Sequence, residues 1–285
     1  MSLAARLLVL LRVEAQKLLS RRLTVVAFGL VVLVAFAGPW AGQVVDTARG
    51  LTSDRPAAAD PYQNGWTALA GSVGSARMFL LVVLLVLSAS TVSEETSLGT
   101  LKALCARPLR RSELLLSKLT VVWGYGVALH LCAVAAAALG AELTHGLYDV
   151  PVDPLFPERI KHAFGDMCLL LYEVTALSAL PLLSLCALGL LCSVLLEHSG
   201  HATGAAIGAA FVCSAAAGLS ERVHELVFTV HLGASFEAFG DVAQRITGSE
   251  ADLAASVPAA LAVPLVWALA LFGLSALLLE RRDIA

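Results

Sequence analysis

The chain has 285 residues, of which 58% are hydrophobic and 14% are charged, and its formal net charge is −3. Ordinary soluble domains contain roughly 45–50% apolar and about 25% charged residues, so this composition excludes a typical water-soluble domain. The near-neutral charge balance gives no indication of a nucleic-acid partner.

Six apolar segments are long enough to cross a bilayer as helices, since the hydrocarbon core requires roughly 20 mostly apolar residues. Backbone groups in lipid must be satisfied within the segment, and these runs lack the alternation of barrel strands. The sequence therefore predicts an all-α polytopic membrane protein, with residues 1–285 forming a single transmembrane domain. The predicted spans cover residues 23–42, 72–93, 113–140, 166–196, 202–220 and 257–279.

Residues 3–21 precede the first span and show the pattern of a helix lying on the membrane surface. Leu7, Leu11 and Leu18 share one face at helical spacing, whereas Glu14 and Lys17 lie roughly opposite. Such an interfacial helix rests in the headgroup plane with its apolar side toward the lipid. The alternative is a cytosolic continuation of the first span.

The distribution of lysine and arginine predicts the orientation of the chain. With the N-terminus inside, the inner segments contain about twice as many of these residues as the outer loops. We therefore expect a multi-pass protein of the cytoplasmic (inner) membrane with both termini cytosolic. The outer loop at 220–256 contains few helix breakers, and we expect one or two short extracytoplasmic amphipathic helices there.

A charged segment between the second and third spans is the most informative part of the sequence. Ser93–Ser97 provides hydroxyl and carboxylate groups suited to starting a helix, and Pro108 would end that helix. A short helix parallel to the membrane, with an apolar face and flanking charges, is suited to a groove on another protein. The alternative is a solvated turn between two spans.

The pattern S-E-E-x-x-x-G-T-L-x-x-L-x-x-R-P-L-x-R-x-E-L-L-L-x-K in this segment resembles ABC-2 type permeases, the membrane subunits of one class of ATP-binding-cassette exporters. Length and spacing look closest to the NosY-like single-domain group, and the resemblance covers nearly the whole chain. It implies that the cytosolic segment 94–112 contains a coupling helix that contacts the ATPase. The residues that match the coupling motif are Glu94, Glu95, Gly99, Thr100, Leu101 and Lys102.

The chain contains no GxxxxGK[ST] motif, so it binds no nucleotide through a P-loop. The resemblance implies a permease subunit that catalyses no covalent chemistry, with ATP and Mg bound by a separate ATPase chain. It also implies two ATPase copies and a second permease copy, in a homodimer or a heterodimer. A periplasmic accessory protein is a further candidate partner. Two alternatives stay open, an intramembrane enzyme and an ATP-independent membrane scaffold.

Small residues recur at the start of the fifth span, where Gly200, Gly204 and Gly208 are spaced four apart. This spacing places them on one helix face and lets two helix backbones approach closely. The face could pack within the subunit or across a dimer.

Ionisable residues at membrane depth are costly and are usually paired or exposed to water. Arg77 falls near the outer third of the second span, and Glu173 falls at a similar depth in the fourth. We expect these two residues to pair or to line an outward-opening cavity. The alternative is that Arg77 lies at the interface.

The outer loop at 220–256 contains His224, Glu225 and His231, which fall near one helical face. Histidine and carboxylate are ligands for zinc or copper, so these residues are weak candidates for a metal site. A solvated face of an amphipathic helix is the favoured interpretation.

Overall fold

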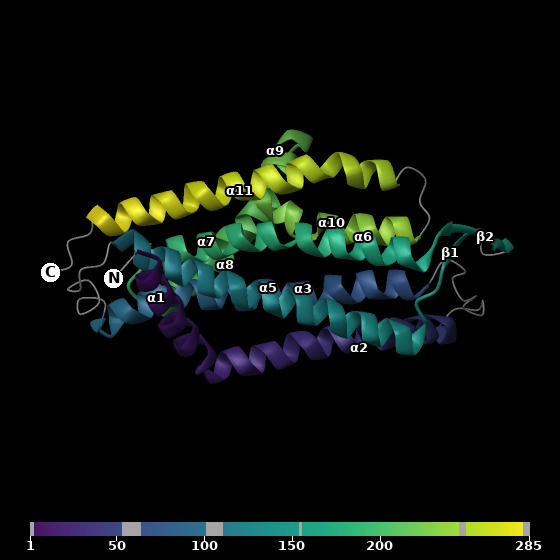
Figure 1. The fold of residues 1–285 in the computed structure, drawn as a ribbon, viewed down its shortest axis with the longest axis horizontal. Coiled ribbons are helices and arrows are strands. Elements are labelled where there is room, and N and C mark those ends of the chain that lie inside the picture. The colour runs from purple at the N-terminus through teal and green to yellow at the C-terminus, as the bar shows by residue number, and fades with distance from the viewer. Residues whose placement is uncertain (1–2, 53–63, 101–110, 154–155, 245–248, 282–285) are drawn as a thin grey trace.

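The computed structural model describes residues 3–52, 64–100, 111–153, 156–244 and 249–281. Long helices run side by side through the molecule, and a small antiparallel sheet lies at one end (Figure 1). The helices are α1 (Leu3–Leu19), α2 (Arg22–Thr52), α3 (Gly65–Ser97), α5 (Arg111–Thr144), α6 (Phe164–Leu177), α7 (Ala179–Leu195), α8 (Ser199–Ala216), α9 (Glu221–Leu226), α10 (Phe228–Ala243) and α11 (Ser249–Arg281). The strands are β1 (Val150–Asp153) and β2 (Phe156–His162).

Five helical stretches are long and apolar enough to cross a membrane, which confirms the predicted all-α polytopic class. They are Arg22–Ala41, Gly65–Ser97, Arg111–Thr144, Phe164–Leu195 and Ser249–Arg281. The segment predicted as the fifth span corresponds to α8, a helix of 18 residues that is shorter than each of these five stretches. At 1.5 Å per residue α8 is about 27 Å long.

The fourth span consists of two helices, α6 and α7, which meet at Ser178. Pro181 in the first turn of α7 has no backbone N–H, so it cannot donate to the carbonyl of Leu177 one turn earlier. Two residues before Pro181, the carbonyl of Ala179 accepts a hydrogen bond from Trp123 Nε1 on α5 at 2.8 Å. A side chain of the neighbouring helix therefore stabilises the break.

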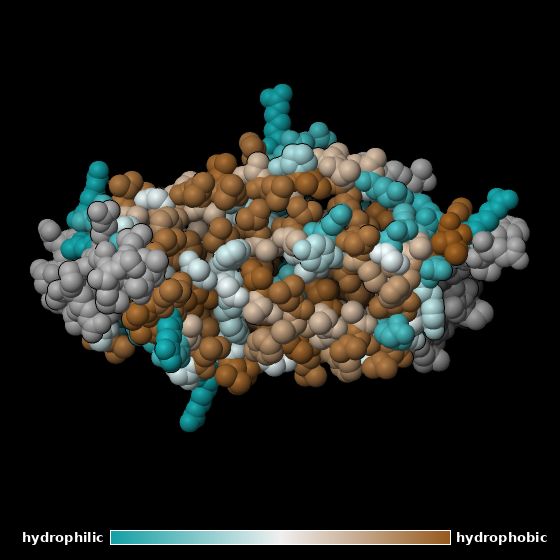
Figure 2. All heavy atoms as spheres, viewed as in Figure 1, coloured by the Kyte–Doolittle hydropathy of each residue, from teal (hydrophilic) through white to brown (hydrophobic). Residues whose placement is uncertain are grey.

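The centre of the bundle is α3, which packs against α2, α5, α7 and α8. Close approach to α7 depends on Gly189, because a Cβ there would overlap Ser88 of α3. The exterior of the middle of the molecule is mostly hydrophobic in the face that Figure 2 shows. This combination of an apolar interior and an apolar belt is that of a helix bundle in lipid.

α8 and α10 run one after the other along the bundle, with a break between them. α8 begins at the end that contains α1 and reaches the middle, and α10 continues toward the sheet (Figure 1). Phe228, Phe236 and Phe239 of α10 are buried, with Phe239 in edge contact with Trp66 of α3. α10 therefore packs inside the bundle, whereas the sequence indicated a surface segment over 220–256. Its aromatic face is covered by protein instead of headgroups.

The short helix α9 projects from the side of the bundle at the junction of α8 and α10. Trp267 Nε1, in the middle of α11, donates a hydrogen bond to the carbonyl of Leu226 at 2.8 Å and fixes the end of α9 there. Figure 2 shows hydrophilic side chains projecting at the place of α9. Four polar residues of α9 are exposed: Glu221, Arg222, His224 and Glu225.

Candidate functional site

Charged side chains from α1, α3 and α5 form ion pairs with one another. α1 lies at the end of the bundle where both chain termini are marked (Figure 1). We call this group of side chains the α1–α3–α5 cluster, and it consists of Glu14, Lys17, Arg21, Glu94, Glu95 and Lys118. It joins residues that are about 100 positions apart in sequence, and it includes Glu94 and Glu95 of the segment that resembles a coupling motif.

Lys118 of α5 is the buried centre of the cluster, with a side chain that is 1% exposed. Its Nζ lies 3.1 Å from Glu14 Oε2 of α1 and 2.8 Å from Glu95 Oε1 of α3. It also donates to the carbonyl oxygen of Thr91 at 3.2 Å. An ammonium group has three donors, so these contacts satisfy it fully. One cation therefore joins three helices.

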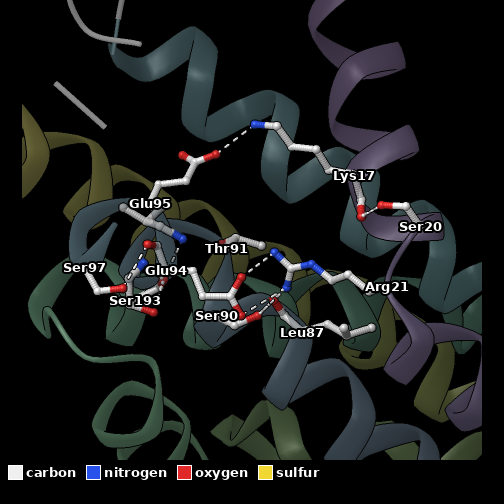
Figure 3. A network of polar contacts seen from close by, with 12 residues as sticks. Lys17, Ser20, Arg21, Leu87, Ser90, Thr91, Glu94, Glu95, Ser97 and Ser193 are labelled. Carbon is white, nitrogen blue, oxygen red and sulfur yellow. Dashed lines mark hydrogen bonds and ion pairs between the residues drawn. The ribbon is translucent and has the colours of Figure 1, made fainter. Parts of the chain in front are cut away.

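Lys17 contacts the same two carboxylates from the outer side of the cluster. Its Nζ lies 3.1 Å from Glu14 Oε1 and 3.0 Å from Glu95 Oε1, and Figure 3 shows it reaching from α1 toward Glu95. Two ammonium groups thus face two carboxylates, so the charges of this group balance. This balance matters because an unpaired charge at low exposure is strongly destabilising.

Arg21 connects the end of α1 to α3 through a second ion pair. Its Nη2 lies 2.6 Å from Glu94 Oε2, and its Nη1 donates to Glu94 Oε1 at 3.3 Å and to Ser90 Oγ at 3.0 Å (Figure 3). A guanidinium group bound to both oxygens of a carboxylate fixes distance and orientation together. The hinge between α1 and α2 is therefore tied to the last turns of α3.

The pKa of Glu14 depends on the balance between burial and its cationic neighbours. Burial alone would raise this pKa, but the charges of Lys118 and Lys17 outweigh it and hold the pKa below its usual value. Burial likewise tends to lower the pKa of Lys17, and its bonds to Glu95 and Glu14 raise the pKa above its usual value instead. Both groups are therefore charged at neutral pH.

The structure corrects the predicted position of Glu94 and Glu95. These residues belong to the last turn of α3, whereas the sequence indicated that Ser93–Ser97 begins a new helix. Carboxylates at a helix C-terminus are disfavoured by the helix dipole. The three cations of the cluster offset this effect, which explains why α3 continues through the acidic pair.

A turn at Gly99 follows the end of α3 directly after the cluster. Gly99 has a φ of 69°, a left-handed conformation that favours glycine, and its N–H donates to the carbonyl of Thr96 at 3.1 Å. Thr100 Oγ1 donates to the carbonyl of Glu95 at 3.2 Å. The other predicted coupling residues, Leu101 and Lys102, lie outside the described residues.

A fourth helix contacts the same part of α3. Ser193, near the end of α7, accepts hydrogen bonds from the backbone N–H groups of Val92 and Ser93, both at 2.9 Å (Figure 3). The last two turns of α3 are thus held on one side by α1 and α5 and on another by α7. A displacement of this part of α3 would act on all of them.

α1 packs against the bundle with a face that contains both Leu18 and Glu14, which the sequence pattern placed on opposite sides. Glu14 is 8% exposed and Leu18 is 7% exposed, whereas Leu8 is 66% and Leu19 is 61% exposed. The ion pairs with Lys118 and Glu95 rotate the Glu14 side toward the bundle, and the leucines that face away remain available to lipid. Sequence reasoning missed this role of Glu14.

Arg77 and Glu173 do not form the predicted pair. Arg77 Nη2 lies 3.2 Å from Glu237 Oε1 of α10, and Glu173 on α6 lines a cavity instead. A Cβ at Gly233 would overlap the Arg77 guanidinium, so the glycine provides the space through which Arg77 reaches α10. The prediction missed this partner because it treated 220–256 as a surface segment.

Two further groups of predicted residues stay separate from the cluster. Gly200, Gly204 and Gly208 have no atom of the described chain within 4 Å of a Cβ placed on them, so this face of α8 does not pack within the subunit. His231 is buried, and its Nε2 lies 3.1 Å from the backbone oxygen of Glu225.

The metal candidates His224, Glu225 and His231 therefore do not converge on one point. Among the residues that the structure describes, no group of three or more His, Cys, Asp or Glu side chains could hold a metal ion.

The bundle of membrane-spanning helices and the end cluster beside a Gly-Thr turn define a multi-pass membrane protein of the transporter class. A family model described as ABC-2 family transporter protein matches residues 10–202, which is more than half of the chain. The chain belongs to the ABC-2 family and is a membrane permease of an ABC transporter. A comparison with curated proteins gives no match.

Proposed function

We propose that the chain is the permease subunit of an exporter and that the α1–α3–α5 cluster transmits the movement of a separate ATPase to the membrane helices. The ATPase would bind ATP and Mg and would contact the segment that begins at Gly99. This chain would perform no covalent chemistry. The proposal places the cluster and both termini in the cytosol, with the protein in the cytoplasmic membrane.

The observation that carries this proposal is the ion pair between buried Lys118 and Glu95, which lies four residues before Gly99 on the last turn of α3. Lys118 is bound to α1 and α3, and α7 contacts the same turns of α3 through Ser193. A rigid connection is required because a soft contact would absorb a displacement instead of transmitting it. Buried ion pairs with satisfied hydrogen bonds provide such a connection.

We also propose that two permease copies associate along the glycine face of α8, and that two ATPase copies bind them. No atom of a described residue lies within 4 Å of a Cβ placed on the glycine face, and Phe211 and Val212 beyond it are 74% and 65% exposed. Small residues beside exposed apolar side chains allow close helix packing in lipid. Whether the second copy is identical or related is left to the experiment.

The test is affinity purification of the chain from its native membrane, followed by mass spectrometry. We expect a stoichiometric ATPase with a P-loop, lost in the double variant Gly99→Glu/Thr100→Glu. The matched control is Tyr148→Glu/Val152→Glu, which adds the same charge at the exposed sheet end and should retain the ATPase. A stable, folded preparation without an ATPase would contradict the proposal.

A second measurement distinguishes transport from a scaffold that only recruits partners. In vesicles that contain the reconstituted complex, wild-type permease should change the rate of ATP hydrolysis relative to the ATPase alone. An unchanged rate, with the complex intact, would favour the scaffold. Product formation by the isolated chain would instead favour an intramembrane enzyme.

A further inference from the structure

A cavity of about 460 Å³ lies between α6, α10 and α11, on the side of the molecule near the sheet. This size is within the range of roughly 300–1,000 Å³ that is typical of sites for small molecules. The cavity follows α6 from Asp166 to Leu177, a length of about 16 Å. Its shape and size suit a small organic molecule.

The lining is mostly apolar, and its polar side chains among the described residues are three carboxylates and His162. Leu170 on α6 and Val257 on α11 belong to the apolar part, while Asp166, Glu173 and Glu250 supply carboxylates. Among the residues that the structure describes, no lysine or arginine lines the cavity, and Lys161 lies beside it as the partner of Glu250. The lining therefore favours a ligand that is both apolar and positively charged.

The three carboxylates differ in how far they are already neutralised. Glu250 Oε1 lies 3.5 Å from Lys161 Nζ and 3.2 Å from His162 Nε2. Asp166 Oδ2 accepts a hydrogen bond from the N–H of Ala163 at 3.3 Å, at the start of α6. Glu173 has neither a hydrogen bond nor an ion pair with any described residue.

Of the three carboxylates, Glu173 lies farthest from the start of its membrane-spanning helix. It is two helical turns beyond Asp166 and about 14 Å from the start of α6. A carboxylate at this depth is costly unless a cation or water compensates it. The cation that the sequence suggested, Arg77, is bound to Glu237 on α10 and does not compensate Glu173.

We propose that this cavity is a binding site for an amphipathic organic cation. The cationic centre lies against Glu173, and the apolar body fills the space between Leu170 and Val257. Glu173 would then set the charge preference and the apolar walls would supply the affinity. In the exporter proposed above, this would be a site for substrate near the outer side of the membrane.

The test uses two ions of nearly the same shape and opposite charge, tetraphenylphosphonium and tetraphenylborate. The full chain is purified into phosphatidylcholine nanodiscs, and binding is measured by equilibrium dialysis against empty nanodiscs. We expect the cation to bind at least about tenfold more tightly than the anion, since one carboxylate attracts the first and repels the second. Equal binding of the two ions, as expected for a cavity filled by lipid chains, would overturn the proposal.

Three variants show whether the site is this cavity. Glu173→Gln keeps the size of the side chain and should remove the preference for the cation, whereas Glu221→Gln on α9 should keep it. Val257→Trp should block binding with Glu173 still present. If Val257→Trp lowers the unfolding temperature, Leu170→Trp fills the same space from α6 and replaces it. Cation binding unaffected by the filled cavity would overturn the assignment.

No ATPase is present in these measurements. A negative result would therefore reject the cation site alone, and the coupling experiment would still decide the proposed function.

Discussion

Lys118 on α5 and Glu95 on α3 are joined by an ion pair of 2.8 Å in which the lysine side chain is 1% exposed and the glutamate side chain is 12% exposed. The same lysine holds Glu14 of α1, so its removal leaves two poorly hydrated carboxylates with only Lys17 to compensate them. This arrangement leads to a prediction about stability.

Lys118→Met should destabilise the protein by about 3–5 kcal/mol, because a buried carboxylate loses its partner. Lys17→Met should cost less than about 1 kcal/mol, since Lys17 is 44% exposed and its pairs are screened by water. Denaturant unfolding in detergent, followed by circular dichroism, compares the two variants. Equal losses would show that the buried lysine is not the centre of the cluster.

Acid should weaken the attachment of α1 to the bundle. The pKa of Glu14 is lowered in the folded state from 4.5, so its contribution is present above 4.5 and is lost as the pH falls through the lowered value. The pKa of Lys17 is raised from 10.5, so the contribution of Lys17 persists at acidic and neutral pH and is lost only at alkaline pH, above 10.5.

Thermal unfolding at pH 7 and pH 3.5 tests this sign. The unfolding temperature of the wild type should fall more between these pH values than that of Glu14→Gln, which has no proton to gain at this position. A variant that shows the same fall as the wild type would indicate that other carboxylates cause the acid sensitivity.

Gly99→Ala should destabilise the turn after α3 by roughly 1–2 kcal/mol, since an L side chain is strained in the left-handed region. Space is not the cause, because no atom of the described part of the chain lies within 4 Å of a Cβ at this position. Gly99→Asn should cost less than Gly99→Ala, as asparagine tolerates this conformation better. Unfolding free energies of the two variants should therefore differ, and equal values would argue against the turn conformation.

Gly233→Ala should destabilise the protein by about 1–3 kcal/mol, because the added methyl displaces the Arg77 guanidinium from its contact with Glu237. In an Arg77→Met background the same change should cost less, since the flexible methionine leaves room. A double-mutant cycle of unfolding free energies measures this coupling. Additive effects would show that Gly233 and Arg77 act independently.

Gly204→Leu should lower the dimer fraction in detergent without lowering the stability of the monomer, because no described residue contacts this face of α8. Gly124→Leu on α5 is the matched control, since Gly124 is exposed and also has no neighbour within 4 Å. Size-exclusion chromatography with light scattering measures the dimer fraction. Unchanged assembly of Gly204→Leu would place the interface elsewhere.

The sequence alone predicted the membrane-spanning helices well, because length and hydrophobicity decide whether a segment enters lipid. It placed the end of α3 too early, at the first charged residues. Glu94 and Glu95 continue the helix because cations from α1 and α5 neutralise them, and such partners are distant in sequence. Hydrophobicity does not contain this information.

The contents of the cluster were only partly predictable. The acidic pair, the Gly99 turn and Lys118 all belong to the motif, but the motif did not indicate that Lys118 binds Glu14 and Glu95. A lysine seven residues into a long apolar helix, together with a glutamate within an amphipathic helix, was the available signal. Which of them meet depends on helix rotation, and this also explains why Arg77 binds Glu237 instead of Glu173.

The hydrogen bond from Trp267 to Leu226 has a consequence for the surrounding lipid. It holds α9, with exposed Glu221, Arg222 and Glu225, beside the middle of the 33-residue helix α11. Acyl chains do not solvate charged groups, so water or protein must cover this side of the molecule. Spin-labelled acyl chains should therefore quench a fluorophore at Leu269 more strongly than one at Glu225. Lipid would therefore not surround this transporter completely. The side with α9 would face water or protein, whereas the surface at Leu269 would face acyl chains.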